Sequence, residues 1–177
     1  MTSDLQHSSE RPRLSVVIPA HNEEANIVWC VDELLACVTD EHGIRTEVIV
    51  VNDNSTDATE SRLLDLARRR PQVRVIRRSP PAGFGRAVRT GLEFATGDVV
   101  VIYMADRSDH PIDALNYYRE ILNGHDCVFG SRFMPGAVVH HYPRLKLVVN
   151  RIVNRAIQWM FWTDLNDLTN AFKAYRR

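Results

Sequence analysis

Apolar residues in this chain alternate between short runs and helically spaced stripes, and this alternation predicts the order of its elements. Short runs rich in Val and Ile predict five buried strands, at 14–20, 46–53, 73–78, 99–103 and 126–132. Between the strands, apolar residues recur at helical spacing and predict four helices, at 22–38, 55–69, 83–96 and 111–124. This β-α-β-α order is typical of a mostly parallel sheet with helices on its faces, so we expect one α/β domain over 14–177.

Three further segments do not follow this order. Residues 1–13 contain no apolar stretch and predict a short disordered tail rather than a secretory signal. Residues 133–144 contain Pro, Gly and two His without a period, which predicts a loop. Residues 145–162 predict a long helix that carries basic residues and ends in tryptophans. Two interpretations of this helix stay open: it lies in a membrane interface, or it packs on the sheet and exposes a basic edge to water.

The composition restricts the classes of function that the chain can have. Its 22 basic and 22 acidic residues balance, which argues against a dedicated nucleic-acid-binding protein. The three cysteines, Cys30, Cys37 and Cys127, lack CxxC spacing, so we expect a reducing compartment, no structural disulfide and no zinc site. No apolar run reaches about 18 residues, so the sequence predicts no membrane-spanning helix.

Two carboxylates follow the run of apolar residues at 99–103. Asp106 and Asp109 come just beyond this predicted strand, at the edge where open α/β sheets bind ligands. Two carboxylates placed together repel each other unless a positive charge lies between them, and a divalent cation carrying a diphosphate would supply it. Asp109 precedes Pro111 and could equally cap the next helix, so both interpretations of Asp109 remain open.

Polar residues also follow the first two predicted strands. After the first strand, Asn22 could cap the next helix and place Glu23 and Glu24 in its first turn. After the second strand, Asp53 could accept hydrogen bonds from a base or a ribose hydroxyl, or belong to a simple Asx turn. The GFG sequence at 83–85 follows the third strand instead of the first, which counts against a dinucleotide-binding dehydrogenase.

Five motifs occur along the chain in a fixed order: SVVIPAHNEEANI, EVIVVNDNSTDAT, GFGRAVRTGLEFATGDVVVIYMAD, GSRF and DLTNAFKAYRR. Together they resemble the family 2 glycosyltransferases of the GT-A fold, in particular the dolichol-phosphate mannose synthase and polyprenyl-phosphate glycosyltransferase branch. The resemblance covers nearly all of the chain from Leu14 onward. It implies a Rossmann-like, mostly parallel sheet flanked by helices, and a membrane-associated transferase that uses a nucleotide sugar and a metal.

The resemblance also implies roles for individual residues. The residues expected to bind the nucleotide sugar are Pro19, Ala20, Asn22, Glu23, Asp53, Ala105 and Asp106. Within this set, Asp53 is expected to bind the base. Asp106, with Asp109, is expected to hold Mg²⁺ or Mn²⁺ on the donor diphosphate, while Arg132 is expected near the phosphates. The DLTNAFK segment is expected to face the sugar and the acceptor.

The expected reaction moves a hexose from GDP-mannose or a UDP-hexose to a polyprenyl phosphate, or another glycan or lipid acceptor, at the cytoplasmic face of a membrane. A single displacement would invert the anomeric carbon, with Asp106 through its metal and Arg132 stabilising the leaving diphosphate. A phosphate acceptor is already anionic, so this reaction needs little or no general base.

The sequence departs from the family pattern at three places. Met104 stands where the metal motif usually has its first Asp, and Asn54 stands where Gly is usual, although Asn also tolerates a left-handed backbone. The chain ends directly after FKAYRR, so we expect it to lack part of the family's C-terminal region. Two alternatives therefore stay open: a catalytically impaired nucleotide-sugar-binding module, and a nucleotidyltransferase. The latter would usually carry a Gly-rich basic loop after the first strand, where PAHNEE stands.

Overall fold

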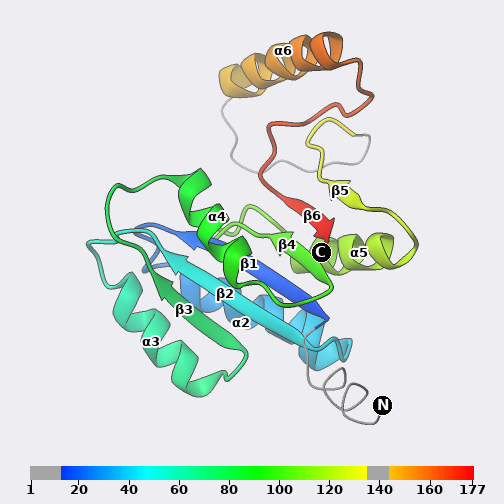
Figure 1. The fold of residues 1–177 in the computed structure, drawn as a ribbon. Coiled ribbons are helices and arrows are strands. Elements are labelled where there is room, and N and C mark those ends of the chain that lie inside the picture. The colour runs from blue at the N-terminus through cyan, green and yellow to red at the C-terminus, as the bar shows by residue number, and fades with distance from the viewer. Residues whose placement is uncertain (1–12, 135–143) are drawn as a thin grey trace.

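A six-stranded sheet organises the chain in the computed structural model, which describes residues 13–134 and 144–177 (Figure 1). The strand order is β3-β2-β1-β4-β6-β5, in which only β6 runs against its neighbours. The strands are β1 (Leu14–Ala20), β2 (Thr46–Asn52), β3 (Val73–Arg77), β4 (Val99–Ile102), β5 (Cys127–Phe129) and β6 (Lys173–Arg176). The mostly parallel sheet expected from the sequence is therefore confirmed.

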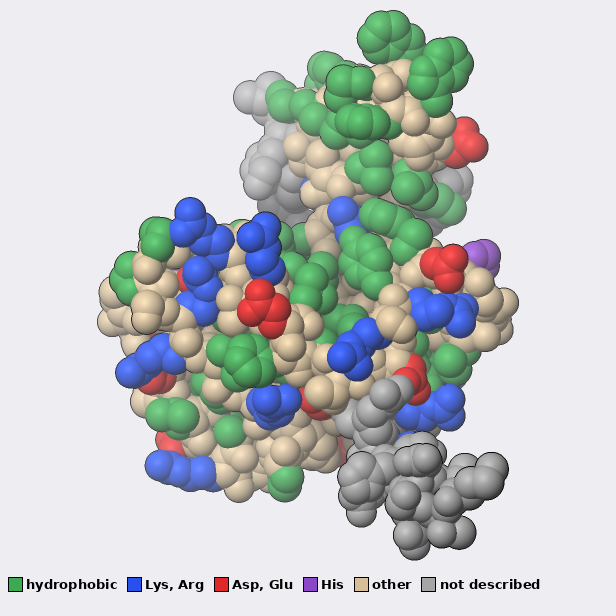
Figure 2. All heavy atoms as spheres, in the orientation of Figure 1, with side chains coloured by type: hydrophobic (Ala, Val, Ile, Leu, Met, Phe, Trp, Pro, Cys, Tyr) green, Lys and Arg blue, Asp and Glu red, His purple; other side chains and the backbone are tan. Residues whose placement is uncertain are grey.

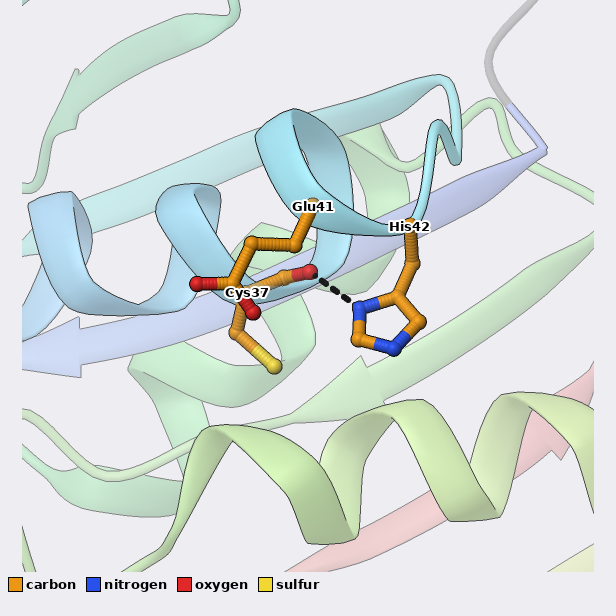
Figure 3. Close-up of side chains that lie close together, drawn as sticks. All are labelled: Cys37, Glu41 and His42. Atoms are coloured by element: carbon orange, nitrogen blue, oxygen red, sulfur yellow. Dashed lines mark hydrogen bonds between the residues drawn. The ribbon is translucent and has the colours of Figure 1, made fainter.

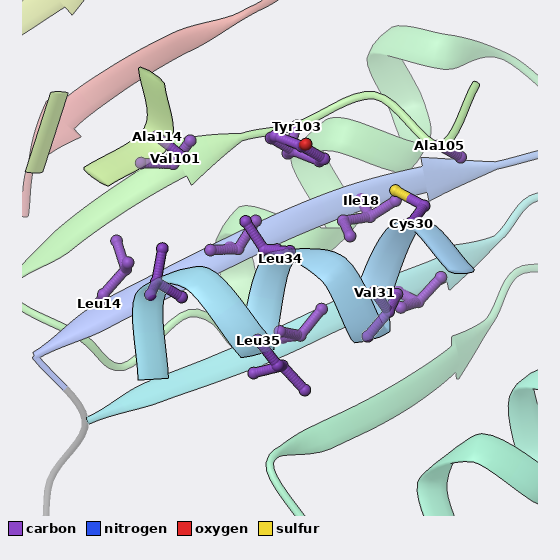
Figure 4. Packing of buried hydrophobic residues seen from close by; sticks show 14 of the residues in the cluster. Leu14, Ile18, Cys30, Val31, Leu34, Leu35, Val101, Tyr103, Ala105 and Ala114 are labelled. Atoms are coloured by element: carbon purple, nitrogen blue, oxygen red, sulfur yellow. The ribbon is translucent and has the colours of Figure 1, made fainter. Parts of the chain in front are cut away.

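The helices cover both faces of this sheet. They are α2 (Ile27–Leu35), the π-helix η1 (Ala36–Glu41), α3 (Thr59–Arg69), α4 (Phe84–Phe94), α5 (Pro111–Leu122) and α6 (Arg144–Phe161). Side chains of α2, η1, α3 and α5 form one apolar cluster with the sheet, shown in part in Figure 4, while α4 packs on the opposite face. A Cβ at Gly91 would collide with the Val17 side chain, so glycine allows α4 to approach β1 closely.

The observed boundaries differ from the predicted ones at specific places. Strands β1 to β4 agree with the prediction to within one residue, but β5 is shorter than the predicted 126–132. The helix predicted at 22–38 begins only at Ile27, and its last turns widen into η1. Residues 1–12 of the predicted tail at 1–13 and most of the predicted loop at 133–144 lie outside the described residues.

Strand β6 is an element that the apolar pattern did not predict. It is four residues long and inserts between β4 and β5, antiparallel to both. Only Ala174 among its residues is fully buried, and charged residues stand at both of its ends. A strand this short has too few alternating positions for a period-two pattern to be visible.

Helix α6 lies apart from the sheet, beyond β5 and β6 (Figure 1). Its apolar side chains are mostly exposed, and Figure 2 shows them as a hydrophobic surface over this helix. Of the two interpretations left open by the sequence, the one in which this helix packs on the sheet is therefore wrong. Among the described residues, no helix combines the length and the apolar character needed to cross a membrane.

Candidate functional site

The carboxyl ends of β1, β2 and β4 meet at one edge of the sheet and bring the predicted site residues together. Ala20 pairs with Asn52 across β1 and β2, and Val17 pairs with Ile102 across β1 and β4. The loops that leave these strands therefore start beside one another. Ligands of open α/β sheets bind at such an edge, so the fold supports the predicted location.

Pro19 and Ala20, at the end of β1, are buried at this edge, and so is Ala105 beyond β4. Proline has no N–H, but the pairing of β1 with β4 ends at Val17, so Pro19 lies beyond that ladder. The carbonyl of Ala20 accepts a hydrogen bond from the N–H of Asp53 at 2.8 Å. These residues thus shape the edge through their backbone.

Reciprocal hydrogen bonds join the loop after β1 to the loop after β2. The N–H of Asn22 donates to Ser55 Oγ at 3.0 Å, and Thr56 N–H donates to Asn22 Oδ1 at 2.8 Å. Ala58 N–H, at the start of α3, donates to Glu24 Oε2 at 2.8 Å. Much of the polar character that the sequence places at these strand ends is therefore used to lock the two loops together.

This arrangement corrects the predicted role of Asn22 as a helix cap. The N-cap of α2 is Asn26, and no acidic residue lies in its first turn. Asn22 adopts a left-handed backbone with φ of 56°, which Asn tolerates better than most residues. Glu23 and Glu24 precede the helix, and the Glu23 N–H donates to Thr59 Oγ1 at 2.8 Å.

Asp53 is the most heavily hydrogen-bonded acid at this edge. Its buried carboxylate forms an ion pair with Arg78, and the Gly83 N–H donates to Asp53 Oδ2 at 2.6 Å. Asn54, left-handed with φ of 61°, donates its side-chain amide to the other oxygen at 3.0 Å. The GFG segment is thereby held against the end of β2.

Sequence reasoning did not identify Arg78 as a site residue. The available signal was an arginine at the end of β3, one strand away from an acid at the end of β2. The predicted contact of Asp53 with a base remains a prediction. A base that binds this carboxylate would have to share it with the groups already bound to it.

Asp109 does not cap α5, so that interpretation is wrong. The N-cap is His110, whose Nδ1 accepts a hydrogen bond from Ile112 N–H at 3.3 Å. Asp109 instead turns back to the strand end, where its Oδ2 accepts from Met104 N–H at 2.9 Å. Burial raises the pKa of Asp109 to about 7, and the charge of Asp106 acts in the same direction.

The acids after β4 have the chemistry of a site for a hard cation. Asp106 is exposed, and one of its oxygens accepts from Ser108 N–H at 3.0 Å. A bound cation would relieve the repulsion that contributes to the raised pKa of Asp109. Within the described residues, no third acidic, His or Cys ligand completes a cluster with these two. Carboxylate oxygens are ligands of the kind that Mg²⁺ and Mn²⁺ accept, together with waters and phosphate oxygens.

Arg107 is a further charged residue at this edge that sequence reasoning did not single out. It follows Asp106 directly and has a left-handed backbone with φ of 65°. Its guanidinium carbon lies 3.2 Å from the ring centroid of Trp29 on α2, a cation–π arrangement. No periodicity in the sequence pairs these two positions, which are far apart along the chain.

Arg132 binds the segment that precedes β6. Its Nε and Nη2 donate to the two carboxylate oxygens of Asp167 at 2.8 and 2.7 Å, and Nη2 also donates to Thr169 Oγ1 at 3.0 Å. Asn154 of α6 donates to the same Asp167 at 3.2 Å. Burial alone would raise the pKa of Asp167, but the hydrogen bonds and charge of Arg132 hold it below its usual range.

The residues of the DLTNAFK segment therefore hold Arg132 in place, a role that the sequence did not indicate. The motifs GSRF and DLTNAFKAYRR supplied both partners, but nothing in them showed that Arg132 and Asp167 pair. The predicted position of Arg132 near phosphates remains a prediction.

Comparison with known proteins identifies the class to which this fold and edge belong. The family described as Glycosyl transferase family 2 matches residues 15–177. The dolichol-phosphate mannosyltransferase of Pyrococcus furiosus is 32% identical over 168 residues, which are 93% of this chain and 46% of that protein. The polyprenol monophosphomannose synthase of Mycolicibacterium smegmatis is 30% identical over 169 residues, 93% of this chain and 62% of that protein.

A solved structure shows the same fold. It is the glucosyl-3-phosphoglycerate synthase of Mycobacterium tuberculosis in complex with Mn²⁺, UDP-glucose and phosphoglyceric acid, with a TM-score of 0.68 at 25% identity. The match covers 97% of this chain and 58% of that one. The chain thus belongs to glycosyltransferase family 2 and has the GT-A fold. It spans about half to three-fifths of the length of the relatives described here.

Proposed function

We propose that this chain is the nucleotide-sugar-binding part of an inverting glycosyltransferase. The donor would be GDP-mannose or a UDP-hexose, and the acceptor a polyprenyl phosphate. The observation that carries the proposal is the single sheet edge at which Asp53, Asp106 and Asp109 gather in a family 2 fold. The names of the P. furiosus and M. smegmatis relatives support the polyprenyl acceptor.

The acids of this edge would bind different parts of the donor. Asp53, oriented by Arg78 and the Gly83 N–H, would accept from the base. Asp106 and Asp109 would hold Mg²⁺ or Mn²⁺, which would supply positive charge to the leaving diphosphate. The M. tuberculosis neighbour, solved with Mn²⁺ and UDP-glucose, supports the use of a divalent metal.

Catalysis would consist mainly of positioning and charge stabilisation. Arg132, held rigidly by Asp167, would present its positive charge to the phosphates as the sugar leaves. The acceptor phosphate is anionic at neutral pH and would attack the anomeric carbon directly, so no residue of the chain needs to remove a proton. One displacement on the face opposite the diphosphate would invert the anomeric carbon.

The exposed surface of α6 would place this domain against an anionic membrane, at its cytoplasmic face. The helix contains four basic and no acidic residues, and most of its apolar side chains are exposed. Aromatic residues at its end, including Trp159, would lie at the depth of the headgroups. A polyprenyl acceptor would be anchored in the same membrane.

Nucleotide-dependent metal binding tests the proposed site. We expect GDP or UDP to raise the affinity for Mn²⁺, because Asp106 and Asp109 supply few ligands and the diphosphate supplies others. Asp106→Asn should weaken nucleotide-dependent Mn²⁺ binding by about tenfold or more. Asp109→Asn, which keeps an acceptor for the Met104 N–H, should weaken it as well. Calorimetric titration of Mn²⁺ with and without nucleotide measures both effects.

Asp65→Asn is the matched control, because Asp65 is exposed on α3. Equal Mn²⁺ affinity with and without nucleotide would contradict a shared site. Unchanged binding in Asp106→Asn would remove the β4 edge from the mechanism.

A second candidate function is a nucleotide-sugar-binding module without catalytic activity. Met104, which stands where the family has a carboxylate, favours it. The two candidates share the binding site and differ in turnover. Slow hydrolysis of the donor that depends on Mn²⁺ and on Asp106 would support the transferase, whereas binding without turnover would support the module.

A further inference from the structure

A second group of metal-ligating side chains lies at the end of the long helical segment that follows β1. Cys37, Glu41 and His42 each place a ligand atom within 4.8 Å of the others (Figure 3). Cys37 is half-buried, while Glu41 and His42 are exposed. The thiol, the carboxylate and a ring nitrogen can therefore approach a common ion that enters from solvent.

The three residues meet where the π-helix η1 ends: Cys37 and Glu41 belong to η1, and His42 is its C-cap. In an α-helix, residues five apart lie about 140° from each other around the axis, so Cys37 and His42 would diverge. The wide turns of η1, whose hydrogen bonds run from residue i to i+5, end at Glu41. His42 follows as the C-cap with a non-helical backbone (φ of −109°), and its N–H donates to the Thr39 carbonyl. Such wide turns are rare and frequently occur at functional sites.

A hydrogen bond orients the His42 ring within this group. His42 Nδ1 lies 2.8 Å from the carbonyl oxygen of Cys37 (Figure 3). A carbonyl only accepts, so Nδ1 carries the proton and Nε2 keeps its lone pair. Histidines that bind metals commonly donate their other nitrogen to a carbonyl in this way, which fixes the ring and its tautomer.

The mixed donor set indicates which metal would bind. One thiolate, one imidazole and one carboxylate suit Zn²⁺, which accepts sulfur, nitrogen and oxygen ligands. Three protein ligands with a water in the fourth position form a familiar open zinc site. Burial and the charge of Glu41 raise the pKa of Cys37, against the opposite effect of Arg119. A bound cation would displace the thiol proton and offset the charge of Glu41.

We propose that Cys37, Glu41 and His42 form a Zn²⁺-binding site. It lies at the opposite edge of the sheet from Asp53 and Asp106, because η1 leads into the start of β2. The site is therefore separate from the one proposed for the nucleotide sugar. The spacing of the cysteines predicted no zinc site in this chain. The proposed site needs only one cysteine, however, because Glu41 and His42 supply the other two ligands. Zn²⁺ bound here would tie down the last turn of the helix and stabilise the native state by mass action.

Titration with Zn²⁺ and Co²⁺ tests the site on the intact chain. We expect one equivalent of Zn²⁺ to bind and to protect Cys37 from a thiol reagent. Co²⁺ should give a sulfur-to-metal charge-transfer band. Cys37→Ser should abolish the band and the protection, and His42→Gln should weaken Zn²⁺ binding by about tenfold or more.

Cys127→Ser is the matched control, because Cys127 is exposed on β5, away from η1. It should leave both the band and the Zn²⁺ affinity unchanged. Circular dichroism confirms that each variant is folded. A band that survives in Cys37→Ser, or one that disappears in Cys127→Ser, would overturn the proposal. Mn²⁺ binding with nucleotide should be unaffected by Cys37→Ser, so the proposed Zn²⁺ site and the proposed nucleotide-sugar site are tested independently.

Discussion

Helices α2 and α6 are both rich in apolar residues, yet the structure uses them in opposite ways. Five residues of α2 are buried, at Ile27, Cys30, Val31, Leu34 and Leu35, and the last four are labelled in Figure 4. In α6 most of the apolar side chains are exposed, with Ile152 at 62% and Trp159 at 82%. Figure 2 shows hydrophobic side chains gathered over this helix. Among the side chains described for this helix, the one that is fully buried belongs to a polar residue, Asn154.

The connections on either side of each helix explain the difference. α2 links the neighbouring parallel strands β1 and β2, and a crossover between such strands brings its helix back onto the sheet. α6 lies between β5 and β6, which are antiparallel neighbours and need no helix on the sheet between them. Asn154 ties α6 to Asp167 and Thr169 by hydrogen bonds. An apolar helix is thus buried by its connections as much as by its composition.

The largest expected effect is on the free energy of unfolding, which should respond much more to a substitution in α2 than to one in α6. Leu34→Ala should lower the free energy of unfolding by about 2–5 kcal/mol, because it leaves a cavity in the core. Ile152→Ala should change it by no more than about 0.5 kcal/mol, because the side chain is exposed. Urea unfolding measures both values. Similar losses in the two variants would mean that α6 is covered in the folded protein.

A smaller effect concerns the polar anchor of α6. Asp167→Asn should cost about 1.5–3 kcal/mol, because it removes a charge-assisted pair with Arg132. The lowered pKa of Asp167 means that its stabilisation is present above the ordinary carboxyl pKa and is lost as the pH falls through the folded-state value.

The difference between wild type and Asp167→Asn should therefore shrink below about pH 4. Urea unfolding at a series of pH values measures this change. Asp164→Asn is the control, because Asp164 is exposed on the same loop. If the stability difference between wild type and Asp167→Asn does not depend on pH, the charge of Asp167 is not the cause of the stabilisation.

The smallest effect tests the membrane surface on α6. The wild-type domain should bind vesicles that contain anionic lipid, and binding should weaken with salt. Arg155→Gln should reduce binding about fivefold, since one basic residue near the surface contributes about 1 kcal/mol. Arg62→Gln, on exposed α3, should have no effect. Absence of sedimentation with anionic vesicles at low salt would contradict the membrane proposal.

Local pattern in the sequence was enough to determine the core architecture. The apolar runs of β1 to β4 and the stripes of α2 to α5 follow from steric and periodic preferences of neighbouring residues, so the α/β order was predictable. The location of the acids at strand ends was predictable for the same reason. The motifs added the family, which the comparisons confirm.

Tertiary structure decided which partners the polar residues have. Asn22 could have capped its own helix but binds Thr56. A cap was one of two open interpretations of Asp109, which instead accepts from Met104. Each of these contacts depends on which strands become neighbours, and no local period encodes that. The pairing of Asp53 with Arg78 likewise required β3 to lie beside β2.

The sequence by itself therefore determined the succession of strands and helices, except for β6, and the edge where a site would form. Only the tertiary structure decided that β6 enters the sheet between β4 and β5, that α6 stays exposed, and that η1 gathers Cys37, Glu41 and His42. The physical reason is the range of the interactions. Backbone and side-chain preferences act between neighbours in the chain, whereas strand insertion, helix burial and carboxylate partners depend on contacts between distant segments.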